Sequence, residues 1–193
     1  KDWCGRVSCD PQRTEDHSGQ GHAGETKELS SSASIGHSTG PGQNGLVDLF
    51  MDITIRDIAS DDISAVIGLI REFAEFEGLG PHCEITEERL GAAMFGSAAV
   101  VEGLIAVDGS RAVGYALYFP NFSSFRGQRG LYLDDIYVSG DHRGQAIGEA
   151  MLKQIAQKAS ARGFERIDFL VLDWNTKAAD FYLKLGAVRD DEE

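Results

Sequence analysis

The sequence is short of cysteine, proline and long apolar runs. Its 193 residues include only three cysteines and four prolines, which excludes the disulfide framework that holds many small secreted domains together. No apolar segment approaches the roughly 20 residues that a membrane-spanning helix needs. The N-terminus also lacks the basic, apolar and small-residue series of a signal peptide. The sequence therefore predicts a soluble protein of a reducing, cytoplasmic compartment, without membrane contact.

Basic residues are also scarce. Lysine and arginine number 18 against 31 aspartates and glutamates, giving a formal net charge of −13. Nucleic-acid binding needs basic side chains to neutralise phosphates, so we expect no nucleic-acid partner. The acidic balance is compatible with a cationic substrate, but by itself it equally indicates solubility.

Residues 1–50 differ in composition from the rest of the chain. They are rich in glycine, serine and other polar residues, and no helical or strand period persists in them. Such a stretch cannot bury enough apolar area to offset its chain entropy. We therefore expect a disordered or non-native N-terminal extension, with Met51 as the natural start and residues 51–193 as the folded domain.

A zinc site in this extension is disfavoured. Its spacing, C-x4-C-x7-H-x4-H, lacks the close cysteine pair and the longer central loop of zinc-binding motifs. We predict no metal. The residues concerned are Cys4, Cys9, His17 and His22.

From Met51 onward, the spacing of apolar residues predicts a mixed α/β sheet in the order β-α-α-β-β-β-α-β-α. Ser60 or Asp61 is expected to cap the first helix and Thr86 the second. The expected strands lie near 53–55 and at 99–107, 112–119, 131–138 and 167–172; helices begin after the two caps and span 145–161 and 176–185; residues 120–130 form a loop.

A glycine-rich turn joins the strand at 131–138 to the helix at 145–161. It reads Arg143-Gly144-Gln145-Ala146-Ile147-Gly148. Small residues let the backbone approach a bulky anion, and the N–H groups of a helix start attract negative charge. A diphosphate is the natural ligand, although an ordinary glycine turn before a helix has the same pattern. The third glycine of a dinucleotide fingerprint and the Gly-Lys-Ser/Thr of a Walker loop are absent.

This turn resembles the acetyl-CoA signature R-G-x-G-x-G/A of the GNAT acetyltransferases, with Ala146 where the family usually has glycine. The likeness covers about residues 53–187 and is greatest to the branch that acetylates spermidine, spermine and thialysine. The matching motifs are Leu133-Asp134-Asp135-Ile136-Tyr137-Val138, Asp173-Trp174-Asn175, Phe181-Tyr182, Phe119-Pro120-Asn121-Phe122 and Phe76-Glu77.

The resemblance implies the GNAT acyl-CoA N-acyltransferase fold and transfer of an acetyl group from acetyl-CoA to a primary amine. The implied substrate is a small cation, such as a polyamine, a diamine or a thialysine-like amine. Acetylation of a peptide or protein amine, and acyl-CoA binding without catalysis, remain alternatives. The acidic positions Glu77, Asp134 and Asp135 favour a compact dicationic ligand over an extended peptide.

Two adjacent aspartates interrupt an apolar strand. Asp134 and Asp135 should lie on opposite faces of a regular strand, unless a bulge redirects them. A carboxylate near the amine can bind the cation and accept its proton. The resemblance makes Asp134 the base and gives Asp135 to the substrate site, while one exposed and one structurally bonded aspartate is an equally good interpretation of the pattern.

The remaining roles come from the resemblance alone. It implies that Tyr182 protonates the CoA sulfur and that Phe76 and Glu77 line the amine site. Without it, Tyr182 and Phe76 would be interpreted as core aromatics, Glu77 as a solvated charge and Asn175 as a helix cap. The residues expected to bind acetyl-CoA are Ile136, Tyr137, Val138, Arg143, Gly144, Gln145, Ala146, Ile147, Gly148 and Asn175.

The last expectation concerns the C-terminal end. Members of the resembled family continue with an apolar hairpin, and Asp190-Asp191-Glu192-Glu193 looks like the loop before it. The fold is therefore expected to be truncated before this hairpin, with the apolar strand 167–172 left unpaired and prone to association. By the same resemblance, the full-length protein should be a homodimer.

Overall fold

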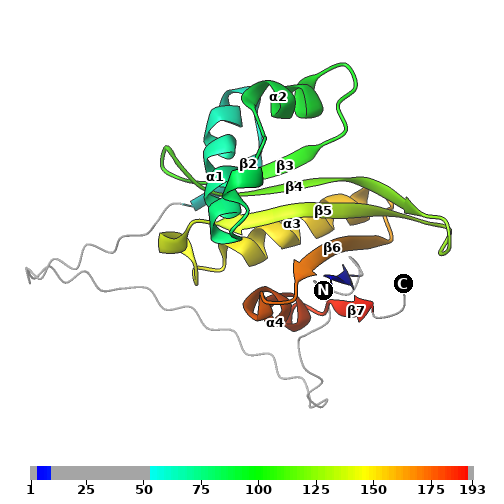
Figure 1. The fold of residues 1–193 in the computed structure, drawn as a ribbon. Coiled ribbons are helices and arrows are strands. Elements are labelled where there is room, and N and C mark those ends of the chain that lie inside the picture. Colours follow the sequence, from blue (N-terminus) through cyan, green and yellow to red (C-terminus); the bar gives the residue numbers. More distant parts are fainter. Residues whose placement is uncertain (1–3, 10–52, 191–193) are drawn as a thin grey trace, which may run out of the picture. The chain divides into compact units, whose positions relative to one another are not determined.

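The computed structural model describes residues 4–9 and 53–190. Within these ranges a seven-stranded sheet has the order β2-β3-β4-β5-β6-β1-β7 (Figure 1). The strands are β1 (Cys4–Cys9), β2 (Ile53–Asp57), β3 (Glu102–Asp108), β4 (Arg111–Ser123), β5 (Gln128–Val138), β6 (Arg166–Leu172) and β7 (Val188–Asp190); the helices are α1 (Ile63–Phe76), α2 (Glu87–Phe95), α3 (Ile147–Ala161) and α4 (Thr176–Lys184). The β5–β6 pair is parallel and its neighbours are antiparallel, so the predicted mixed sheet is confirmed.

Helices cover both faces of the sheet. One buried cluster joins α1 to β3 and β4 through residues such as Val66, Ile105 and Tyr115. A second cluster joins α3 and α4 to the opposite face, with Met151 of α3 and Leu133 of β5 among its members. Because side chains alternate along a strand, these two clusters identify the face to which each strand residue points. Below, the two sides are called the α1 face and the α3 face.

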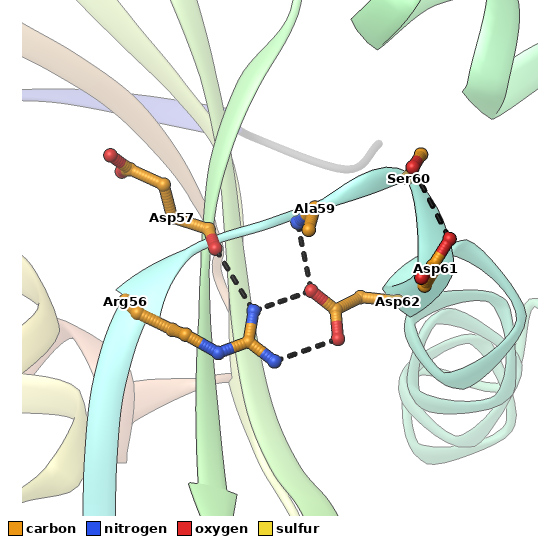
Figure 2. A network of polar contacts seen from close by, with 6 residues as sticks. All are labelled: Arg56, Asp57, Ala59, Ser60, Asp61 and Asp62. Carbon is orange, nitrogen blue, oxygen red and sulfur yellow. Dashed lines mark hydrogen bonds and ion pairs between the residues drawn. The ribbon is translucent and has the colours of Figure 1, made fainter.

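The start of α1 differs from the prediction. Neither Ser60 nor Asp61 caps it; a short 3-10 turn, Ser60–Asp62, precedes the helix. The carboxylate of Asp62 accepts a hydrogen bond from the Ala59 N–H at 2.8 Å and further hydrogen bonds from both terminal nitrogens of Arg56 (Figure 2). The bonds from Arg56 lower the pKa of Asp62. An ion pair with β2 therefore anchors the beginning of this helix, where we expected a single capping side chain.

Other helix boundaries follow the sequence signals. Thr86 accepts the N–H of Arg89 at 3.2 Å, as an N-cap does. The glycines after α1, α3 and α4 adopt positive φ, a conformation that an L side chain makes costly. These terminators are Gly78, Gly163 and Gly186.

The predicted loop at 120–130 is wrong. β4 continues to Ser123 and β5 begins at Gln128, so the two strands form a long hairpin. Pro120 lies within β4, although proline cannot donate to a ladder. However, the last pair between β3 and β4 is Glu102–Tyr118, and Pro120 pairs only with Leu131 of β5. A proline is tolerated where a strand has one open side.

We expected residues 1–50 to lack regular structure, and β1 shows that this expectation is wrong for residues 4–9. This strand pairs antiparallel with β6 from Cys4–Leu172 to Cys9–Ile167, and its other side pairs with β7. The open edge predicted for β6 is therefore also wrong, because a strand from the beginning of the chain fills that position. Residues 10–50 lie outside the described residues, as do the side chains proposed and rejected as zinc ligands, Cys4, Cys9, His17 and His22.

In the described ranges, 4–9 and 53–190, no helix combines the length and the apolar composition needed to cross a membrane.

Candidate active site

The sheet opens between its two parallel strands. β5 and β6 pair from Gly130–Arg166 to Leu133–Phe169, and beyond Leu133 the two strands have no further pairs in the described part of the chain. β5 nevertheless continues to Val138, paired on its other side with β4. The backbone of 134–138 thus presents a strand edge next to the start of α3. An extended ligand can pair with such an edge as an additional strand does.

A β-bulge in β5 places both aspartates on one face. Leu117 pairs with Asp135, but the next residue of β4, Tyr118, pairs with Leu133, which leaves Asp134 as the extra residue. On the α3 face the cluster includes Leu133 and then Ile136, so the alternation shifts by one residue between them. Both Asp134 and Asp135 therefore point to the α1 face. Of the two sequence-based possibilities, the bulge is the one that the structure adopts.

Three carboxylates share this face. Burial raises the pKa values of Asp134, of Asp135 and of Glu77, which immediately follows α1. The pKa of Asp135 reaches about 6, through burial first and then repulsion by Asp134 and Glu77. Repulsion between like charges means that a cation bound among them would relieve an electrostatic cost. The site is suited to an ammonium group.

Exposed aromatic rings border these carboxylates. Phe76 is 46% exposed and Trp174 is 54% exposed, and their ring centroids are 5.8 Å apart. The guanidinium of Arg143 lies 4.5 Å from the Phe76 centroid and 5.3 Å from that of Tyr137. An aromatic face that accepts one cation can accept another. Phe76 therefore presents an exposed ring directly before Glu77, and its role in the amine site remains a prediction.

The turn before α3 has the backbone of an anion cradle. Gly144 has φ +80° and Ala146 has φ +58°, which bends the chain sharply into the first turn of the helix. A β-carbon at Gly140 or Gly144 would meet no atom within 4 Å, so there is open space beside these two glycines. These residues fit a diphosphate at the N-terminus of a 15-residue helix. Arg143 does not lie free, because its Nε donates to the Val138 carbonyl at 2.9 Å.

The C-terminal candidates lie on or beside α4. Asn175 caps this helix by accepting the Ala178 N–H at 3.1 Å. Tyr182 is buried, with its ring 3.9 Å from that of Phe169 and 5.2 Å from that of Phe181. Phe181 also lies 3.7 Å from the position of a β-carbon on Gly148, so α4 contacts the cradle. The acid role of Tyr182 remains a prediction.

Sequence reasoning missed two polar contacts. Tyr115 of β4 donates to Asp135 at 3.1 Å, and Ser139, at the end of β5, donates to Glu72 of α1 at 2.8 Å. The second contact ties α1 to the segment leading into the cradle. Neither bond follows from spacing, because each joins residues far apart in the chain. A buried tyrosine on a strand next to an acidic pair is the only sequence signal for the first contact.

The described residues, 4–9 and 53–190, contain no group of three or more His, Cys, Asp or Glu side chains arranged to hold a metal ion.

The fold and this site together define an N-acetyltransferase. Residues 69–187 match the profile of the Acetyltransferase (GNAT) family, and the chain belongs to that family. Relatives of known activity confirm the resemblance to the thialysine and spermidine/spermine branch.

The thialysine N-epsilon-acetyltransferase of Bos taurus is 38% identical over 143 residues, covering 70% of this chain and 84% of the relative. The spermidine/spermine N(1)-acetyltransferase-like protein 1 of Homo sapiens is 32% identical over 141 residues, covering 69% of this chain but 20% of that protein. Among solved structures, a probable acetyltransferase superposes with a TM-score of 0.63 at 23% identity, covering 72% of this chain and 93% of its own, which supports the fold alone.

Proposed function

We propose that this protein transfers an acetyl group from acetyl-CoA to a primary amine of a small cationic substrate, of the polyamine, diamine or thialysine type. One observation carries the proposal: the β5 bulge turns two carboxylates toward Glu77 on one face, at the opening of the sheet. The names of the relatives are consistent with such substrates. A ligand with two ammonium groups would balance more of this negative charge than a neutral amine would.

The proposed binding of acetyl-CoA uses the cradle and the free edge of β5. The N–H groups at the start of α3 and the guanidinium of Arg143 hold the pyrophosphate. Backbone groups of 136–138 pair with the pantetheine arm, and Asn175 contacts the same arm. Bound acetyl-CoA supplies the acetyl thioester. Because Arg143 donates to Val138 and covers Phe76, its side chain must turn away when both substrates are present.

The proposed acid–base roles follow the positions of the polar side chains. Asp134, the more exposed of the pair, accepts a proton from the ammonium, directly or through a water molecule. Asp135 and Glu77 bind the cation, and Phe76 supports it with its ring. Tyr182 delivers the proton to the departing sulfur. We further propose a cytoplasmic location and a homodimeric assembly.

The test is release of free thiol from acetyl-CoA by the purified protein. Spermidine, a short diamine and thialysine are compared with a lysine-containing peptide and with an uncharged primary amine. We expect turnover with the di-cationic amines and little with the peptide. Preference for the peptide would contradict the substrate class.

Replacement Tyr182→Phe should lower kcat by roughly 10- to 10⁴-fold without weakening acetyl-CoA binding. Tyr132→Phe, on β5 beside Phe119, serves as the matched control.

A further inference from the structure

Tyr115 carries a hydroxyl that core packing does not need. Its side chain is fully buried, and its ring lies 6.4 Å from that of Tyr137, centroid to centroid. A phenylalanine would fill the same space. Burying a hydroxyl costs free energy unless it is hydrogen-bonded. Its partner is Oδ2 of Asp135, at 3.1 Å.

The backbone register fixes this contact. Tyr115 pairs directly with Tyr137, and Asp135 pairs with Leu117, so the tyrosine is diagonal to the aspartate on the α1 face. Diagonal neighbours are within reach of a long aromatic side chain. The ring of Tyr115 is held by the core, whereas Asp135 borders the open site. The tyrosine is therefore the fixed partner and the carboxylate is the group that becomes oriented.

The charges around Asp135 make this hydrogen bond consequential. Asp134 on the same strand and Glu77 at the end of α1 both disfavour its ionisation, in addition to burial. The bond from Tyr115 acts in the opposite sense and favours the charged carboxylate. Among the described groups that influence Asp135, none is a cation. Without a bound ammonium, the tyrosine hydroxyl is thus what counteracts the repulsion.

We propose that Tyr115 is a positioning residue for the acetyl transfer, whose hydroxyl holds the Asp135 carboxylate ionised and aimed at the amine site. The proposal rests on the proposed function, in which Asp135 binds the substrate ammonium. With Oδ2 occupied by the hydroxyl, Oδ1 is presented to the incoming cation. Tyr115 acts through Asp135 and does not itself contact the substrate.

The experiment is the pH profile of kcat/KM for the amine in Tyr115→Phe. The acid limb of the unchanged protein should lie near the Asp135 pKa of about 6. In Tyr115→Phe it should move to higher pH, because the bond favouring ionisation is gone. At pH 6.5, kcat/KM should fall about tenfold, mainly through a higher KM for the amine. The KM for acetyl-CoA should not change.

Tyr118→Phe is the matched control. Tyr118 is a buried tyrosine on the same strand, but it points to the α3 face and packs in the other cluster. Loss of its hydroxyl should leave the acid limb in place. An equal shift in both variants, or no shift in Tyr115→Phe, would overturn the proposal, because the effect would then be one of general packing or absent.

Carboxyl carbon NMR separates this proposal from the proposed function. The Asp135 resonance should titrate at higher pH in Tyr115→Phe than in the unchanged protein, whether or not any amine is acetylated. Absence of turnover together with this shift would reject the function and retain the contact. Should Tyr115→Phe fail to fold, 3-fluorotyrosine at position 115 keeps the ring and strengthens the donor. The Asp135 titration should then move to lower pH, and no movement would overturn the proposal.

Discussion

Ala146 combines an unfavourable backbone conformation with a place in the ligand cradle. It is the one described residue other than glycine with positive φ, at +58°. A β-carbon in the left-handed region costs on the order of 1 kcal/mol. The resembled family usually has glycine at this position, and the positive φ of Ala146 gives a physical reason for it, since glycine adopts this conformation freely.

Replacement Ala146→Gly should therefore stabilise the protein by about 0.5–1 kcal/mol and hold or improve acetyl-CoA binding. The gain is limited because glycine also makes the unfolded chain more flexible. Urea denaturation and calorimetric titration measure the two effects. The control is Ala150→Gly within α3, which should destabilise by about 1 kcal/mol. A destabilised Ala146→Gly protein would show that the β-carbon makes a contact worth more than the strain.

Asp135 should make the stability of the protein depend on pH. Its pKa is raised from 3.8 to about 6 in the folded protein, so between these values the folded state binds more protons than the unfolded state. Stability should therefore fall as pH rises from about 4 to about 6 and should stay reduced above that. This loss of stability is the consequence of placing an ionised carboxylate in a partly buried site proposed to bind a cation.

The variant Asp135→Asn removes the penalty. We expect it to be about 1–3 kcal/mol more stable than the unchanged protein at pH 7.5 and no more stable at pH 4. Amine acetylation should be lost in the same variant. Urea denaturation at both pH values measures the difference, with the exposed Asp180→Asn on α4 as the control. A gain of equal size at both pH values would mean that the carboxylate charge is not its cause.

At the scale of secondary-structure elements, local signals predicted more than pairing did. Thr86 acts through its own backbone neighbourhood and caps α2 as expected. Gly163 and Gly186 follow the ends of their helices through equally local backbone geometry. The bulge at Asp134 could be named only as a possibility, because it depends on how β4 and β5 align. The predicted loop at 120–130 was wrong for the same reason, because the β4–β5 hairpin continues through Pro120. Whether a proline interrupts a strand depends on which neighbours that strand has.

A buried ion pair lies within β6, and a hydrogen bond from Asn121 ties it to the β4–β5 hairpin. Arg166 and Asp168, 7% and 1% exposed, approach within 2.6 Å, and Asn121 of β4 donates to the same carboxylate at 2.8 Å. Truncation of one partner leaves the other charge buried without compensation. The variant Asp168→Ala should therefore lose about 3–5 kcal/mol of stability.

The control for this loss is the exposed pair Glu102–Arg162, whose closest nitrogen and oxygen atoms are 2.7 Å apart. Both side chains are about two-fifths exposed, so water screens their attraction. Glu102→Ala should cost less than about 1 kcal/mol. Chemical denaturation of the two variants gives the comparison. Similar losses would mean that burial does not set the strength of the Arg166–Asp168 pair.

At the scale of the whole molecule, the sheet depends on a strand from far away in the sequence. β1 lies between β6 and β7, more than 150 residues from either along the chain. No periodicity in residues 1–50 indicated this strand. Six residues are too few for a clear alternating pattern, and all the partners of β1 lie far away in the sequence. The homodimer inferred from the resemblance remains a separate prediction.

Interruption of β1 should expose the edge of β6. In Val7→Pro the chain keeps its length and charge, but proline cannot donate to a ladder and is poorly tolerated in a strand paired on both sides. Val7 pairs with Phe169 of β6 and with Arg189 of β7. We expect a lower Tm, by roughly 2–4 °C for each kcal/mol lost, and increased self-association, because unpaired backbone next to apolar side chains recruits other strands. Thermal denaturation and light scattering provide the test. They are measured at one concentration for Val7→Pro, for a protein lacking residues 1–9 and for the unchanged chain. The two altered proteins should behave alike. Unchanged Tm and scattering in both would show that β6 needs no partner from the N-terminal segment, because β1 would then contribute nothing to the stability of the sheet.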